Sequence, residues 1–192
     1  MIGSHPVAPV SRRAALARLG GGALGLALAA RGLGAAAQDA SPAASPGAIP
    51  PLLAEWAAAW TAHDADRVLA LYAPDGVYEE VPTNTVARGH DQIRAFLAFN
   101  FAVFSDVEVR PEAGFQGGGG AALRAVFAGR YTGQIPGLPA GTGQSFALRF
   151  ATVFELDGDT IRRNTDYFDN YDFLVQLGVL PAPGGAAGTP TA

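Results

Sequence analysis

The stretch TDYFD, residues 165–169, sets two carboxylates among two aromatic rings near the end of the chain. Such a carboxylate either lies on the wet face of a half-buried strand or points into an apolar cavity. In a cavity, loss of hydration disfavours the charged form and raises the pKa toward neutrality. A carboxylate with a pKa near the working pH is an effective general base, so this stretch is the first candidate for chemistry.

The alternation of side chains along a strand separates the two carboxylates. If residues 160–169 form a regular strand, Asp166 and Phe168 share one face and Asp169 takes the other. Asp169 can cap the helix expected after the strand or contact a substrate, and we retain it as a candidate binding residue. Asp166 either faces a cavity or forms an ion pair across the sheet, with Arg149 or Arg162 as partner.

Other kinds of reactive site are not indicated. The chain has no cysteine, which excludes thiolate sites, and no grouping of His, Asp and Glu has the spacing of metal ligands. His63 and His90 lie at expected helix ends, and Ser105 has no base near it in any pattern. We therefore predict neither a metal nor a cofactor.

Composition limits the partners of the folded region. All 13 basic residues are arginine, and residues 1–37 hold four of them with no acid. The remaining nine arginines face 17 acidic residues. A domain of this charge lacks the clustered cations that phosphate contacts need, so we predict no nucleic-acid partner.

Residues 1–37 have the pattern of a bacterial signal peptide. The motif SRRAAL resembles the twin-arginine translocation signal, an apolar run covers residues 20–30, and three alanines at 35–37 suit cleavage. The run is shorter than the ~20 residues that span a bilayer, so we expect an exported protein with no stable membrane anchor. The alternative is an ordinary secretory signal with a chance arginine pair.

Two segments are too poor in large apolar residues to fold. Residues 38–49 and 181–192 consist mainly of Ala, Ser, Pro and Gly, which cannot bury enough surface to offset their ordering entropy. We predict a flexible linker and a disordered tail, and a folded domain between them at residues 50–180.

The first half of this domain is predicted to be mainly helical. Apolar residues at helical spacing predict a first helix from residue 50. Asp64 is expected to cap a second helix, which ends at the PDG turn of residues 74–76. A third helix is predicted at residues 89–104. Residues 77–82 form a short strand between the last two helices. Of the tryptophans in the first helix, Trp56 is the candidate to line a pocket mouth.

The second half changes to the period of a strand. Strands are predicted at 106–110, 121–129, 145–156 and 160–169, with loops at 114–120 and 131–144 and a closing helix at 170–178. Helices gathered on one face of an antiparallel sheet give an α+β fold. We predict a cone-shaped, curved antiparallel sheet whose concave face is covered by the three N-terminal helices and encloses a pocket.

This order of elements resembles that of a known family. The stretches WTAHDADRVLALYAPDGVYEEVP, RGHDQIRAFL, GQIPGLPAGTGQSFALRFATVFELDGDTIRRNTDYFD and FLVQLG together resemble the SnoaL-like polyketide cyclases of the nuclear transport factor 2-like superfamily, over most of residues 52–178. The resemblance implies a cofactor-free acid–base site and a homodimer formed through the outer sheet face. The superfamily also contains isomerases, dehydratases and non-catalytic binding domains, so the fold alone does not identify a reaction.

The resemblance also implies roles for individual residues. Asp166 matches the cavity-facing carboxylate of the family, and Tyr78 and Glu80 match a tyrosine and an asparagine that hold water in limonene-epoxide hydrolases. The glutamate is a departure, because a second acid in one cavity raises the pKa of one of them and lets acid and base coexist. The alternative is that Glu79 and Glu80 form a solvated pair on an edge strand. Epoxide hydrolysis is disfavoured because the Arg-x-Asp pattern of those enzymes is missing.

Two functions follow from these observations. In the first, Asp166 moves a proton on a small hydrophobic carbonyl compound while Tyr78 donates a hydrogen bond to the developing oxyanion. Substrate-binding candidates are Glu80, Trp56, Phe168 and Asp169. In the second, the exported domain binds a small hydrophobic molecule without turnover.

Overall fold

The computed structural model describes residues 48–184. The predicted signal peptide, nearly all of the linker and residues 185–192 of the tail lie outside this range. Among the described residues, no helix combines the length and the apolar character that crossing a bilayer requires.

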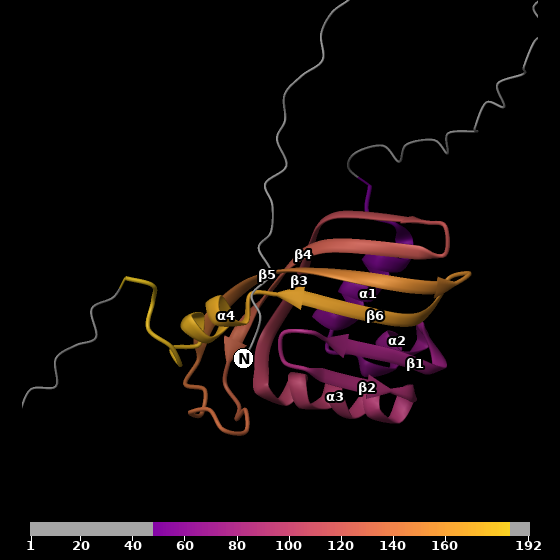
Figure 1. Ribbon diagram of the computed structural model, residues 1–192. Helices are drawn as coiled ribbons and strands as arrows, with labels where there is room; N and C mark the ends of the chain where they lie inside the picture. The colour runs from indigo at the N-terminus through magenta and orange to yellow at the C-terminus, as the bar shows by residue number, and fades with distance from the viewer. Residues whose placement is uncertain (1–47, 185–192) are drawn as a thin grey trace, which may run out of the picture. The chain divides into compact units, whose positions relative to one another are not determined.

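Four helices and six strands make up residues 48–184 (Figure 1). In chain order they are α1 (Pro51–Thr61), α2 (Ala65–Ala70), β1 (Tyr72–Glu80), β2 (Thr85–Arg88), α3 (Gly89–Val103), β3 (Phe104–Gly117), β4 (Gly120–Tyr131), β5 (Gln144–Asp157), β6 (Thr160–Phe168) and α4 (Asn170–Gln176). The strands form one sheet in the order β2-β1-β6-β5-β4-β3.

The predicted α+β class is confirmed, but the sheet is mixed rather than antiparallel throughout. All neighbouring strands are antiparallel except β1 and β6, which run parallel. A parallel pair needs a long connection, and the chain from β2 to β5 supplies it. Sequence periodicity cannot reveal this pairing, because it joins residues that are far apart along the chain.

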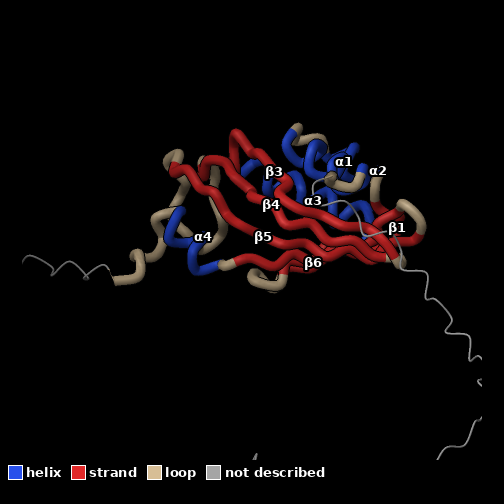
Figure 2. Tube along the Cα trace, turned by 90° about the horizontal axis from the view of Figure 1, so that it is seen from above, coloured by secondary structure: helices blue, strands red, loops and turns tan. Residues whose placement is uncertain are grey.

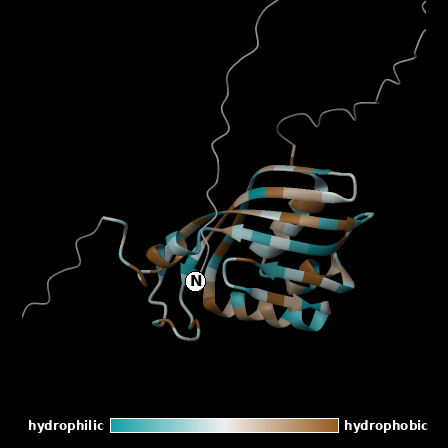
Figure 3. Ribbon diagram, viewed as in Figure 1, coloured by the Kyte–Doolittle hydropathy of each residue, from teal (hydrophilic) through white to brown (hydrophobic). Residues whose placement is uncertain are grey.

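Helices α1, α2 and α3 cover one face of the curved sheet, and α4 lies near one end of it (Figure 2). The predicted division of β5 into two faces is confirmed. Every second residue from Phe146 to Phe154 is buried, while the residues between them are exposed. This alternation is visible as colour bands along the strands in Figure 3. The buried face is the one that the helices cover.

The start of the domain follows the predicted helices closely. Pro51 opens α1, and the Asp64 side chain caps α2 by accepting a hydrogen bond from the Arg67 amide at 3.0 Å. The predicted turn at 74–76 is wrong, because β1 already begins at Tyr72 and the irregular stretch lies within that strand. Tertiary pairing decides this boundary, since Tyr72 is aligned with β6.

Strand β3 is longer than predicted. It runs to Gly117, and the loop expected at 114–120 shrinks to a turn at Gly118 and Gly119, whose φ angles are 61° and 79°. Glycine adopts such positive φ angles without the steric cost that a side chain brings. Pairing with β4 along the whole hairpin draws the preceding residues into the sheet.

Two buried clusters lie on the inner face of the sheet. One contains Trp56 and Trp60 of α1, and the other is built around Phe104 and Phe146. The partly buried rings of Phe127 and Phe168 pack against both clusters. These rings also form the walls of a cavity, which is described next.

Candidate functional site

A cavity with a largely aromatic wall lies between the helices and the inner face of the sheet. It has a volume of about 240 Å³, close to the lower limit of ~300 Å³ for typical ligand pockets. Its wall is mostly aromatic, with a few aliphatic and polar side chains: Trp56, Trp60, Tyr78, Glu80, Thr83, Thr85, Phe96, Phe99, Asn100, Phe104, Val109, Phe127, Ile135, Leu148, Phe150, Asp166, Phe168 and Phe173. None of these is a basic residue, so the cavity suits a small, largely apolar molecule.

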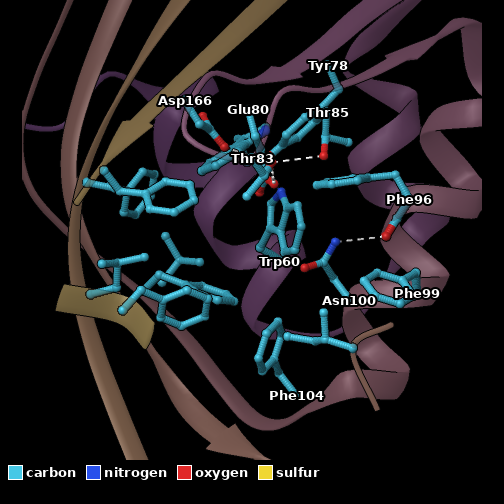
Figure 4. Close-up of a pocket in the computed structure, with 18 residues that line it drawn as sticks. Trp60, Tyr78, Glu80, Thr83, Thr85, Phe96, Phe99, Asn100, Phe104 and Asp166 are labelled. Atoms are coloured by element: carbon cyan, nitrogen blue, oxygen red, sulfur yellow. Dashed lines mark hydrogen bonds between the residues drawn. The ribbon is translucent and has the colours of Figure 1, made fainter. Parts of the chain in front are cut away.

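The parallel pairing of β1 with β6 assembles the polar end of this cavity. Its register aligns Tyr78 with Asn164 and Glu80 with Asp166. Because side chains alternate along each strand, all four point inward. Asp166 is 5% exposed, and Figure 4 shows it with Glu80 and Tyr78 at one end of the cavity. The structure thus places Asp166 in the buried interior, beside the cavity, while its catalytic role stays a prediction.

A chain of hydrogen bonds holds Asp166 in place. Its Oδ2 accepts from the Tyr78 hydroxyl at 2.6 Å, and its Oδ1 accepts from the Asn164 amide nitrogen at 3.1 Å. Asn164 Oδ1 in turn accepts from the Tyr72 hydroxyl at 2.5 Å, and Tyr72 accepts from Trp56 Nε1 at 3.2 Å. Both carboxylate oxygens are therefore bound by neutral donors. Sequence analysis assigned no role to Asn164, although its place two residues before Asp166 on one strand face was a usable signal.

The surroundings of Asp166 shift its titration toward neutral pH. Burial raises the pKa of Asp166 to about 6, and hydrogen bonding by Thr152, Tyr78 and Asn164 opposes this shift. A carboxylate with this pKa is largely ionised at pH 7 and still basic enough to take a proton. The alternative ion pair does not form in the described part of the chain, where Arg162 contacts Asp75 at 3.4 Å.

Glu80 is the second inward-facing carboxylate. Its Oε2 accepts a hydrogen bond from the Thr83 hydroxyl at 3.0 Å. Burial, and secondarily the charge of Asp166, raise the pKa of Glu80 to about 7, against the lowering effect of Thr83. Glu79 points the other way and accepts from Arg163 Nη1 at 2.8 Å. The alternative of a solvated pair on an edge strand is therefore wrong, because β2 flanks β1 and the two glutamates lie on opposite faces.

The position of Tyr78 alters its predicted role. Burial, followed by the charge of Asp166, holds the pKa of Tyr78 well above its usual value, so the phenol keeps its proton. A phenol has one hydrogen to donate, and that hydrogen is directed at Asp166. In this arrangement Tyr78 orients the carboxylate and has no free hydrogen for a substrate oxyanion.

The remaining predicted binding residues divide into two groups. Trp56 and Phe168 line the cavity, but Trp56 is only 2% exposed and belongs to the inner wall rather than to a mouth. Asp169 does not line this cavity. Its Oδ1 accepts from the Asp172 amide at 3.1 Å and caps α4.

Several wall residues were not identified from the sequence as site residues. Thr83 and Thr85 follow the inward-facing Glu80, and Asn100 of α3 donates from Nδ2 to the Phe96 carbonyl at 2.9 Å. Trp60 was counted only as a core residue, yet it lines the cavity and its indole nitrogen has no hydrogen-bond partner. The helical spacing of the two tryptophans indicated that both are buried. It could not show whether they pack in the core or line a cavity, because both kinds of residue are buried. Among residues 48–184 there is no group of three or more side chains able to hold a metal ion.

The family model of the SnoaL-like polyketide cyclases matches residues 52–177. No protein of curated function matches the chain significantly. The matched range includes all the cavity-lining residues.

Solved structures resemble the domain over almost their full length. A hypothetical protein from Catenulispora acidiphila with a ketosteroid isomerase-like fold, in complex with trimethylamine, is 27% identical, with 69% of this chain and 96% of that chain covered and a TM-score of 0.60. A proposed polyketide cyclase from Silicibacter is 25% identical and has a TM-score of 0.60, and the match covers 65% of this chain and 91% of that chain. TsrD from Streptomyces laurentii is 25% identical, covering 67% and 93%, with a TM-score of 0.59.

Proposed function

Because the chain belongs to the SnoaL-like polyketide cyclase family, we propose that it performs cofactor-independent acid–base chemistry on a small hydrophobic carbonyl compound. Cyclase, isomerase and dehydratase reactions all fit this description. The observation that carries the proposal is the buried Asp166 carboxylate, held by Tyr78 and Asn164 at the polar end of an aromatic cavity. A base in this setting meets its substrate without competing water.

In the proposed reaction Asp166 removes a proton from the carbon beside the substrate carbonyl. Electrons from the broken C–H bond move to the carbonyl oxygen, so the carboxylate gains the proton and an enolate forms. Return of the proton to a different carbon, or attack of the enolate on a second carbonyl, gives isomerisation or cyclisation. Tyr78 and Asn164 hold the carboxylate in a fixed direction, which spares reorganisation during proton transfer.

Glu80 is suited to supply the acid of the same reaction. The pKa of Glu80 lies at about 7, so roughly half of the molecules carry its proton at neutral pH. Asp166, with a pKa of about 6, is mostly ionised there. The two carboxylates lie on adjacent strands in register, so they titrate as a pair rather than independently.

The test is hydrogen exchange at the carbon next to a carbonyl. The purified protein is incubated with 1-indanone and with cyclohexanone in D₂O, and the loss of the α-proton signals is followed by NMR. Asp166→Asn should reduce the rate at least ~100-fold, the lower end of what a positioned base contributes, and leave the Tm unchanged or higher. Glu79→Gln is the matched control, since it alters a carboxylate on the other face of the same strand pair.

Two results would count against acid–base catalysis. One is wild-type exchange no faster than buffer for either ketone. The other is exchange that survives in Asp166→Asn with its fold intact.

The second candidate function is binding without turnover. One observation favours it: the Catenulispora acidiphila neighbour was solved in complex with trimethylamine. Aromatic faces attract cations, and the cavity of this chain combines such faces with two carboxylates and no basic residue. Saturable calorimetric binding of trimethylamine, weakened in Asp166→Asn and accompanied by no ketone exchange, would favour this function over catalysis.

We propose export as the cellular setting, on the strength of the twin-arginine pattern and the small-residue cleavage pattern in residues 1–37. Replacing Arg12 and Arg13 together by Lys should leave the protein in the cytoplasm. Cell fractionation measures the outcome, and unchanged export would argue against a twin-arginine signal.

We also propose that the protein forms a homodimer through the outer face of the sheet. Val153 of β5 and Tyr167 of β6 are 47% and 48% exposed, and they place apolar surface on that face. Val153→Arg should convert a dimer to a monomer in sedimentation experiments. A wild-type protein that sediments as a monomer would rule this assembly out.

A further inference from the structure

One polar group on the cavity wall has no partner in the protein. The indole nitrogen of Trp60 is buried without a hydrogen bond, although the residue is only 4% exposed. A buried donor left unpaired costs ~1–3 kcal/mol, and such groups are rare in folded proteins. Trp56, one helical turn away, has no such deficit because its indole donates to Tyr72.

The indole nitrogen of Trp60 lies on the side of the ring nearest the polar end of the cavity (Figure 4). Figure 4 shows the Trp60 ring extending into the cavity with its nitrogen end turned toward Glu80 and Thr83. Within residues 48–184, the only other buried side-chain nitrogen or oxygen without a partner is Nε2 of His63, which does not line the cavity. Among the described residues, Trp60 is thus the one wall residue with a buried side-chain nitrogen or oxygen that has no hydrogen-bond partner.

Apart from Glu80 in its protonated form, the side-chain donors near Asp166 are already committed. The hydrogen of Tyr78 goes to Asp166, that of Tyr72 goes to Asn164, and Thr83 donates to Glu80. A reaction that builds negative charge on a carbonyl oxygen needs a donor that is still free. Glu80 can donate only while it is protonated, whereas the Trp60 N–H is a donor at any pH.

The indole is also held rigidly. Its ring lies 5.5 Å from that of Phe101, 6.0 Å from that of Tyr78 and 6.2 Å from that of Phe127, centroid to centroid. A donor fixed by packed rings does not have to be reorganised when charge develops on the substrate. An indole can only donate, so it favours a ligand with an acceptor oxygen over a protonated amine.

We propose that the Trp60 N–H binds the carbonyl oxygen of the substrate and thereby selects oxygen-bearing ligands for this cavity. The inference rests on the proposed function, because it assigns the oxygen-binding partner of the Asp166 base. Substrate binding satisfies the unpaired donor and orients the carbonyl so that its neighbouring carbon faces the carboxylate.

The chain contains two tryptophans, so ¹⁵N-tryptophan labelling of the whole protein gives two indole N–H signals. Trp60→Phe assigns them by removing one. Titration with 1-indanone should move the Trp60 proton downfield in a saturable way and leave the Trp56 proton nearly still. Indane, which has the same skeleton without the oxygen, should bind without this downfield shift.

Affinities measured by calorimetry give a second readout. One buried hydrogen bond is worth ~0.5–1.5 kcal/mol, so the wild type should prefer 1-indanone over indane by roughly 2- to 12-fold. Trp60→Phe should lose this preference. Trp56→Phe is the matched control and should weaken both ligands while keeping the preference, because that N–H is already bonded.

Several results would overturn the inference. These are equal shifts with indanone and indane, a preference that persists in Trp60→Phe, or no response of the Trp60 signal to indanone. The Trp60 indole signal could instead move only with pH, as Glu80 titrates, and stop moving with pH in Glu80→Gln. That result would assign the N–H to the Glu80 carboxylate rather than to a ligand.

Failure here is distinguishable from failure of the proposed function. Ketone exchange that depends on Asp166, together with a silent Trp60 signal, would keep the acid–base function and remove the role of Trp60. A selective Trp60 shift without any exchange would keep the oxygen-binding donor and remove the catalysis.

Discussion

The two faces of the strand pair β1 and β6 carry the same kinds of residue in opposite settings. On the outer face, Glu79 is 31% exposed in its side chain and pairs with Arg163 at 2.8 Å. On the inner face, Glu80 and Asp166 have only neutral hydrogen-bond donors. The outer carboxylate is held by a cation and is partly exposed, whereas the inner ones line a cavity without a counter-ion.

The comparison teaches that residue type alone does not make a catalytic acid or base. Glu79 and Glu80 are consecutive in the chain, and alternation sends one to water and the other to the cavity. For the inner residue, burial and the neighbouring charge of Asp166 raise the pKa to about 7. Function on this strand pair therefore depends on the face that a carboxylate occupies.

The largest effect is expected from replacing Asn164, which is fully buried in the hydrogen-bond network around Asp166. Asn164→Leu removes the donor to Asp166 and leaves the Tyr72 hydroxyl without its acceptor. We expect a loss of about 3 kcal/mol in the free energy of unfolding and a large fall in ketone exchange, because two buried polar groups lose a partner. Urea unfolding at pH 7 measures the stability. Thr165→Val on the outer face is the control, and a similar cost for both variants would contradict the comparison.

A smaller effect is expected in the pH dependence of stability. The pKa of Asp166 rises from 3.8 to about 6 on folding, and that of Glu80 from 4.5 to about 7. The folded state therefore binds more protons than the unfolded state between about pH 4 and 7, so these two groups make stability fall as pH rises through this window. Each unit of pKa shift corresponds to roughly 1.4 kcal/mol.

Urea unfolding at a series of pH values checks this dependence. The double variant Asp166→Asn, Glu80→Gln should lose most of the decline with rising pH, whereas Glu79→Gln should keep it. The prediction fails if the free energy of unfolding of the wild type rises steadily from pH 4 to 7 and that of the double variant rises in the same way. That result would show that the inner carboxylates are not desolvated.

The smallest effect is expected on the outer face. Glu79→Gln breaks a partly exposed ion pair, and such pairs contribute about 0–1 kcal/mol. Ketone exchange should stay within about twofold of the wild type, since no outer-face group reaches the cavity. Exchange rates and thermal melts test this directly. A loss of activity comparable to that of Asp166→Asn would mean that the two faces are functionally coupled.

Much of the fold was predictable because it follows local rules. Helical spacing identified α1 and α3, Asp64 marked the start of α2, and the alternation in β5 separated its buried residues from its exposed ones. The same alternation grouped Asp166 and Phe168 on one face of β6. These features depend only on residues that are close in the chain.

The site itself depended on contacts that no local pattern contains. The parallel register of β1 and β6 set Glu80 beside Asp166, the network through Asn164 used up the hydrogen of Tyr78, and Trp60 was left with a free donor. From the sequence by itself came the alternation that groups side chains by face. Tertiary structure decided which face became the dry interior and which donors were already used. Strand pairing and burial bring together segments that are distant in the chain. Only the packing of these segments against one another determines which side chains lose water and which hydrogen-bond partners they meet.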